Sequence, residues 1–131
     1  MNPLTIYCFM KCGTFKYSPE TEELEPIKEG DDRDLVAKLD YAKLAPLSLL
    51  MVSDLKKENP ITWINAKLTD EIRKTISYAD ASHCCQNIYL FCASEGLKCV
   101  EGGYFDNEKI LKFLGLDADT FRCVSSIFVG H

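Results

Sequence analysis

The sequence predicts an α+β domain in which a mixed, mainly antiparallel sheet packs on helices, one of them long and central. Three observations predict this fold class. Short apolar stretches separated by turn residues fill most of the first fifty residues, helical spacing runs for more than twenty residues from Thr69, and strand and helix patterns then alternate to the end. Because 131 residues carry neither a linker-like stretch nor an internal repeat, we expect a single domain over residues 1–131.

Composition and charge exclude several classes of partner. Fifteen Lys and Arg against twenty Asp and Glu give a formal charge of −5, and no basic run stands out, so we expect no nucleic-acid partner. The longest apolar stretch, near residues 45–52, falls far short of the roughly 20 residues that a membrane span needs. The first residues lack the pattern of a secretory signal, and we therefore expect a cytoplasmic protein without membrane contact.

The cysteines predict reduced thiols. An odd number without a Cys-x-x-Cys pair argues against a disulfide framework. His83-Cys84-Cys85 is the densest set of metal-ligand types, but adjacent helical side chains diverge by about 100°, so we assign no metal site. A cysteine-based redox or metal protein remains a minor alternative. The seven are Cys8, Cys12, Cys84, Cys85, Cys92, Cys99 and Cys123.

The first half predicts short strands and one helix. The strands are expected at residues 4–10, 14–17, 24–27 and 46–52. The first three would form an antiparallel meander with its prolines at strand ends or at the sheet edge, and the fourth is apolar enough to be buried. Between the third and the fourth, Gly30-Asp31-Asp32 is expected to cap a helix, because Leu35, Val36 and Leu39 follow at helical spacing.

The second half predicts the long helix. It would begin at Thr69 and end at Gly96-Leu97, the pattern of a left-handed C-terminal stop. Residues 86–93 are apolar almost all round, which predicts burial within the domain or between subunits. Within that stretch Tyr89 and Phe91 are assigned to core packing, as is Trp63 before the helix.

A short strand at residues 98–100 then leads into adjacent glycines. Asp106 is expected to cap a helix that ends at Gly115-Leu116, and residues 122–129 predict a final strand. Gly102-Gly103 allow close backbone approach and leave amides free to donate to a ligand, although the glycines alone favour a tight strand-to-helix turn over a ligand site. From the glycines alone, both interpretations stay open.

Taken in order, these segments resemble the nitroreductase family, in particular its short branch related to peptide azoline (thiazole/oxazole) dehydrogenases. The resemblance is carried by residues 86–97, by residues 100–106 with the following Leu114-Gly115-Leu116, and by the closing strand that ends at Gly130. Earlier motifs agree with it. They are Gly13-Thr14-Phe15-Lys16-Tyr17, Leu24-Glu25-Pro26, Gly30-Asp31-Asp32-Arg33 and Ala45-Pro46.

The resemblance implies a nitroreductase-like fold that binds FMN and forms a homodimer through its long central helices. It implies hydride transfer from NAD(P)H, through the flavin, to a small acceptor such as a nitro compound or a quinone. Backbone amides of Val100, Glu101, Gly102 and Gly103 would face the flavin. The flavin carries the chemistry, so no side chain is assigned a catalytic role.

The resemblance also implies a difference from the family. Members open with an Arg-rich segment that holds the FMN phosphate, followed by a stretch whose asparagine touches the flavin; here only Asn2 is a candidate for that asparagine. We therefore expect an N-terminally shortened domain with weakened FMN binding, since each charge-assisted hydrogen bond is worth about 1.5–3 kcal/mol. The alternative is a degenerate, non-catalytic dimer of this fold that acts as a binding or structural module.

Overall fold

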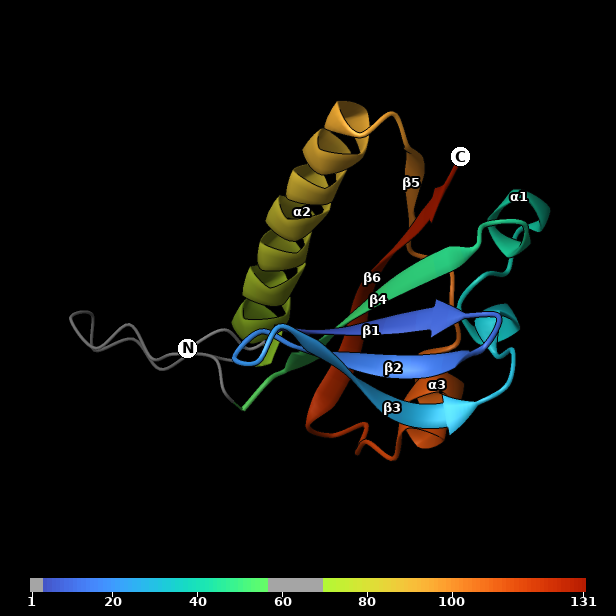
Figure 1. Ribbon diagram of the computed structural model, residues 1–131. Helices are drawn as coiled ribbons and strands as arrows, with labels where there is room; N and C mark the ends of the chain where they lie inside the picture. The colour runs from blue at the N-terminus through green and yellow to red at the C-terminus, as the bar shows by residue number, and fades with distance from the viewer. Residues whose placement is uncertain (1–3, 57–69) are drawn as a thin grey trace.

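The computed structural model describes residues 4–56 and 70–131, which form one six-stranded sheet with helices on both faces (Figure 1). The strands are β1 (Leu4–Met10), β2 (Gly13–Ser18), β3 (Glu23–Glu29), β4 (Leu47–Asp54), β5 (Lys98–Gly102) and β6 (Phe121–Gly130). The helices are the 3-10 turn η1 (Arg33–Leu35), α1 (Asp40–Lys43), α2 (Asp70–Ser94) and α3 (Asn107–Leu114). The predicted α+β class with a long helix is confirmed.

The strand order is β3-β2-β1-β4-β6-β5, and each neighbouring pair in the described sheet is antiparallel. The predicted meander is therefore confirmed as β1-β2-β3. Pro26 lies in β3 at one edge of the sheet, where a missing N–H donor costs least. The opposite edge is β5, whose sequence holds the predicted flavin contacts.

The helix predicted after Gly30-Asp31-Asp32 is wrong. Only the 3-10 turn η1 and the four-residue α1 form there, and Asp32 makes no side-chain capping bond. The cause is Arg33, whose Nε and Nη2 both donate to the Asp31 carboxylate at 2.8 Å while its Nη1 donates to the Ala45 carbonyl at 3.0 Å. These bonds tie the segment to the start of β4, so the chain wraps as a loop.

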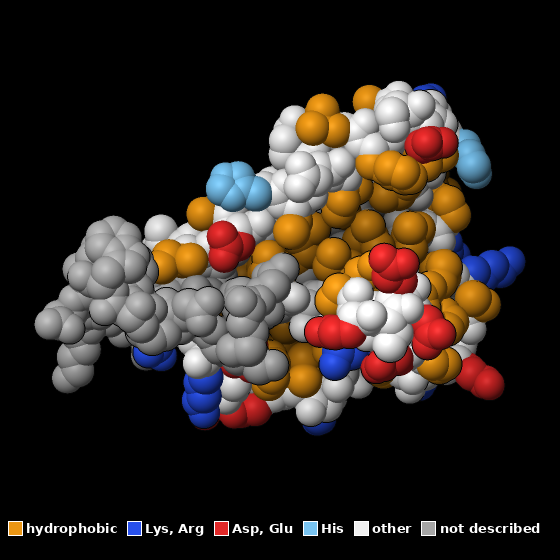
Figure 2. Space-filling model, turned by 60° about the vertical axis from the view of Figure 1, so that its left-hand side comes forward, with side chains coloured by type: hydrophobic (Ala, Val, Ile, Leu, Met, Phe, Trp, Pro, Cys, Tyr) orange, Lys and Arg blue, Asp and Glu red, His pale blue; other side chains and the backbone are white. Residues whose placement is uncertain are grey.

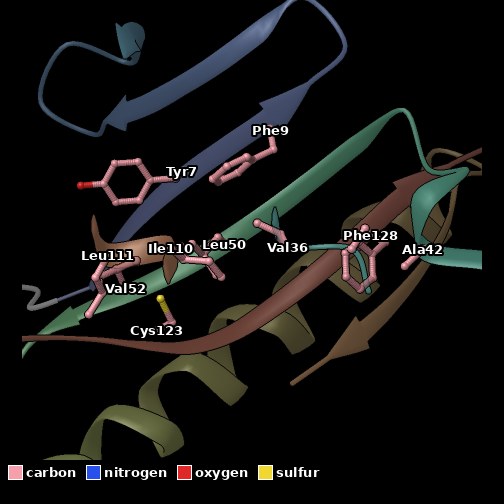
Figure 3. Packing of buried hydrophobic residues seen from close by; sticks show 11 residues of the cluster. Tyr7, Phe9, Val36, Ala42, Leu50, Val52, Ile110, Leu111, Cys123 and Phe128 are labelled. Atoms are coloured by element: carbon pink, nitrogen blue, oxygen red, sulfur yellow. The ribbon is translucent and has the colours of Figure 1, made fainter. Parts of the chain in front are cut away.

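Two apolar clusters hold the layers together, one on each face of the sheet. The first packs η1, α1 and α3 against the sheet around Phe9, Leu50 and Ile110, each of them fully buried (Figure 3). The second packs α2 against the other face, where Met51 and Ile127 of the sheet meet Cys85 of the helix. The second cluster also includes Cys99 of β5, so it holds this edge of the sheet against α2.

The long helix α2 has one buried face rather than burial all round. Ala81, Cys85 and Cys92 are buried against the sheet, whereas Leu90 and Phe91 are 60% and 59% exposed. The assignment of Phe91 to the core is therefore wrong within one chain, because the side chain lies on the flank of the helix. The exposed face also carries Gln86 and Asn87, which need no protein partner there.

Both predicted helix stops are confirmed. Gly96 follows α2 with a φ of 69°, and the Leu97 amide donates to the Cys92 carbonyl at 2.8 Å. Gly115 ends α3 with a φ of 72°. The Asp106 cap is also confirmed, since its Oδ1 accepts from the Lys109 amide at 3.1 Å.

Among the described residues, no helix combines the length and the apolar character needed to cross a lipid bilayer.

Candidate functional site

The strand β5 offers a free edge. It pairs only with β6 in the described sheet, from Lys98 opposite Gly130 to Gly102 opposite Ser126. The groups on its outer edge therefore have no strand partner and are available to side chains or ligands. The Gly96 stop of α2 begins this strand and the Asp106 cap of α3 follows it, so both of its ends are fixed by local sequence.

Glu101 is held at this edge by two contacts. Its backbone N–H donates to the Tyr89 hydroxyl at 2.6 Å, and its Oε1 accepts from the Ser125 hydroxyl at 2.7 Å. The amide thus points away from β6 while the carboxylate is turned toward the face covered by α2. Gly103 follows the last residue of β5, in the turn that leads to α3.

The two glycines differ in their surroundings. A Cβ on Gly102 would lie 2.9 Å from a ring carbon of Phe128 and 3.3 Å from the Ser126 hydroxyl, so no side chain fits. That hydroxyl also donates to the Gly102 carbonyl at 2.9 Å, which fixes the strand end to β6. A Cβ on Gly103 would meet none of the described atoms within 4 Å, so open space lies beside this residue.

Ser125 lies on the same face of β6 as Ile127, the residue paired with Glu101, and therefore lies diagonally across from Glu101. The register against β4 shifts between Met51 and Val52, which leaves Val124 as the additional residue. Val124 packs in the α2-side cluster, and Ser125 lies 3.5 Å from the Cys85 thiol on the same side. Burial raises the pKa of Cys85 to about 11, while the Ser125 hydrogen bond acts in the opposite direction.

A pocket of about 390 Å³ continues along the other half of β5, between this strand and α1. Its walls are mostly apolar and include Leu44, Pro46 and Phe128, together with Val100, which is 39% exposed. Lys98 supplies a positive charge to the lining. The pocket can therefore hold a flat apolar group, with one cation within its wall.

Five of the seven cysteines, Cys8, Cys84, Cys85, Cys99 and Cys123, are poorly suited to chemistry of their own. All seven are free thiols, and burial raises the pKa of Cys123 to about 12 and also raises the pKa of Cys8, Cys84 and Cys99. A thiol with a raised pKa yields little of the reactive thiolate. In residues 4–56 and 70–131, no three His, Cys, Asp or Glu side chains group as metal ligands would.

Four of the five predicted flavin contacts lie together. Val100, Glu101, Gly102 and Gly103 form the end of β5 and the turn after it, whereas Asn2 lies outside the described residues, as does Trp63. The sequence interpretation missed the roles of three side chains: Tyr89, which it assigned to the core, Ser125 and Ser126. No local pattern reveals them, because their partners are backbone groups or lie on other elements.

The donor set fits the ring of a flavin. The polar edge of a flat heterocycle could accept from a neutral backbone amide on the free edge of β5. Open space at Gly103 and the apolar walls of the pocket leave room for the rest of such a ring. The Glu101 carboxylate is bound to Ser125 and so does not face an electron-rich ring. Fold and site together define a class of protein, an α+β domain with a glycine-containing strand end at a free edge of its sheet.

Comparisons with known proteins identify the family. The model of the nitroreductase family matches residues 18–131, and the chain belongs to this family. Its members are in general flavin-dependent oxidoreductases that use FMN with NAD(P)H. The predicted nitroreductase-like fold and the predicted resemblance are thereby confirmed. A search of curated proteins gave no match.

Solved structures share the fold. A protein from Ralstonia eutropha JMP134 assigned as a nitroreductase is 26% identical, with a TM-score of 0.81 over 100% of this chain and 59% of its own. The E. coli microcin synthetase McbBCD complex matches 98% of this chain and 52% of its own at 17% identity and a TM-score of 0.74. A Staphylococcus epidermidis protein assigned as an NAD(P)H:FMN oxidoreductase is 18% identical. Its match covers 98% of this chain and 66% of its own, with a TM-score of 0.67. The last two likenesses show the fold alone.

The chain spans about half to two thirds of the length of these three structures.

Proposed function

We propose that this chain is the flavin-contacting domain of an FMN-dependent oxidoreductase that passes hydride from NAD(P)H to a small acceptor such as a nitro compound or a quinone. One observation carries the proposal: at the free edge of β5 the Glu101 amide points away from β6, and the nearby Gly103 borders open space. The family and the apolar pocket along the same strand support it. We expect the reaction in the cytoplasm.

The residues of this chain would bind and orient the cofactor. FMN, when bound, supplies the hydride chemistry. The amides of Glu101 and Gly103 would donate to acceptor atoms on the ring, and such fixed donors stabilise negative charge that develops on a reduced ring. Ser125 and Ser126 hold the strand end in shape for this task, through Glu101 and Gly102 respectively. Lys98 lies in the pocket wall, and we assign it to binding the FMN phosphate.

The proposal includes a homodimer formed through α2. Leu90 and Phe91 are exposed on this helix, close to its C-terminal end. On the face shown in Figure 2, hydrophobic side chains are visible along α2 and over the sheet beneath it. A second copy that covers this surface would bury apolar area and bring its own residues close to the free edge of β5.

A second function is favoured by a different observation. The Tyr89 hydroxyl already accepts from the Glu101 amide, so one of the flavin donors is engaged within the chain itself. This contact fits a degenerate dimer that has kept the fold as a binding or structural module and no longer takes FMN. Such a protein would dimerise and bind no flavin.

Titration of FMN separates the two functions. If the chain is a flavoprotein domain, it quenches FMN fluorescence saturably, and NAD(P)H oxidation with a quinone or nitroaromatic acceptor depends on added FMN. Riboflavin, the matched ligand without phosphate, is expected to bind more weakly than FMN. Lys98→Ala should reduce the difference in affinity between FMN and riboflavin. A dimer that gives no quenching at any FMN concentration would instead establish the binding module.

A further inference from the structure

We propose that Tyr89 is a gate for the flavin site, whose hydroxyl occupies the Glu101 amide in the ligand-free chain and must be displaced when the ring binds. This inference rests on the proposed function. It goes beyond it by naming a residue of this chain that sets ligand affinity and selects which ligands bind. The observation is the hydrogen bond of 2.6 Å between the Glu101 N–H and Tyr89 Oη.

The contact is not required to satisfy a buried group. Glu101 is an exposed residue, so water could bind its amide if the phenol left. Tyr89 is only partly buried, with its ring against the α2-side cluster and its hydroxyl at the sheet edge. Its side chain has two rotatable bonds, and rotation would free the amide without unfolding the helix.

The amide keeps its position when the tyrosine moves. The Glu101 carboxylate stays bound to the Ser125 hydroxyl at 2.7 Å, and the neighbouring Gly102 carbonyl stays bound to the Ser126 hydroxyl at 2.9 Å. Both serines belong to β6, so neither contact depends on α2. The gate can therefore open while the donor remains preorganised.

The same geometry selects the ligand. An entering ring must replace the phenol oxygen with an acceptor atom of its own, because a ring that covers the exposed amide without accepting from it would deprive the amide of water as a partner. Flat aromatic molecules without an acceptor at that edge would leave the amide unpaired and would bind poorly. The gate thus favours heterocycles with a ring nitrogen or a carbonyl, the chemistry of a flavin ring.

The test uses Tyr89→Phe, which removes the hydroxyl and keeps the ring. Tyr78→Phe is the matched control, because that hydroxyl lies on the same helix and accepts from Arg122 Nε at 2.9 Å, away from β5. Two readouts are compared for the intact chain and both variants. They are the hydrogen-exchange rate of the Glu101 amide without ligand and the dissociation constant of FMN from fluorescence quenching.

We expect the Glu101 amide to exchange faster in Tyr89→Phe alone, and FMN to bind this variant about 2- to 10-fold more tightly, since the ligand no longer competes with a hydroxyl. Unchanged exchange would overturn the gate, because the hydrogen bond would not exist in solution. Faster exchange with equal or weaker FMN binding would also overturn it and make Tyr89 structural, while the proposed function stands. If none of the three proteins binds FMN, the proposed function fails and the gate fails with it.

Discussion

At the scale of residues, the turn after β5 combines two glycines with different roles. Gly102 is required by packing, because the Phe128 ring and the Ser126 hydroxyl occupy the space that a side chain would need. Gly103 faces open space, so packing among the described residues does not explain it. The contrast separates a glycine that packing requires from a glycine that packing leaves free.

This contrast predicts different responses to the same substitution. Gly102→Ala should lower the free energy of unfolding by about 1–3 kcal/mol, because the added methyl group overpacks the Phe128 contact. Gly103→Ala should change it by less than about 0.5 kcal/mol. Urea denaturation of the two variants measures both values, and equal losses would show that the strand end is not packed as described.

Sequence could predict the location of this turn but not its contacts. Glu101-Gly102-Gly103 stands out through its glycines and through the helix cap at Asp106. The Tyr89 contact depends on how α2 packs across β5, and the Ser125 contact depends on the register of β5 against β6. Both are results of tertiary packing between elements, which no local pattern encodes.

At the scale of elements, local sequence patterns predicted strands and helix ends correctly where no tertiary contact overrides them. The strands and the ends of α2 and α3 follow from alternation, capping and glycine stops. The helix predicted after Gly30 does not form, because Arg33 binds both Asp31 and the Ala45 carbonyl. That tie to the start of β4 overrides the helical spacing of Leu35, Val36 and Leu39.

The exposed face of α2 is where we expect a charged substitution to weaken the dimer. If a second copy covers Leu90, Leu90→Glu places an unpaired carboxylate in an apolar interface and should weaken the dimer by about 2 kcal/mol, or roughly 30-fold. Leu39→Glu is the control, since Leu39 is 47% exposed beside α1, which packs on the opposite face of the sheet. Sedimentation equilibrium measures the shift. A dimer that tolerates Leu90→Glu as well as Leu39→Glu would place the interface elsewhere.

At the scale of the whole molecule, the buried thiols couple stability to alkaline pH. Burial raises the pKa of Cys85 to about 11 and of Cys123 to about 12, from the ordinary thiol value of 9.0. The unfolded chain therefore loses these protons at lower pH than the folded chain. The stabilisation is complete below pH 9 and is lost as pH rises through the folded values.

We expect the urea midpoint to fall between pH 8 and pH 10.5, and Cys123→Ala to fall less steeply than the intact chain. Cys12→Ala should keep the slope of the intact chain, because Cys12 is exposed. Comparing slopes rather than absolute midpoints removes the cost of the cavity that Cys123→Ala leaves. Identical slopes in all three proteins would contradict burial of the Cys123 thiol.

The central claim is that the free end of β5 binds a flavin ring through its backbone. Titration of the isotope-labelled chain with FMN, followed amide by amide in nitrogen–proton NMR spectra, tests it most directly. We expect saturable changes in amide chemical shift that are largest at the strand end and smaller at Tyr89. The residues of the strand end are Val100, Glu101, Gly102 and Gly103. Spectra that do not change with FMN, or shifts confined to residues remote from β5 and Tyr89, would contradict it.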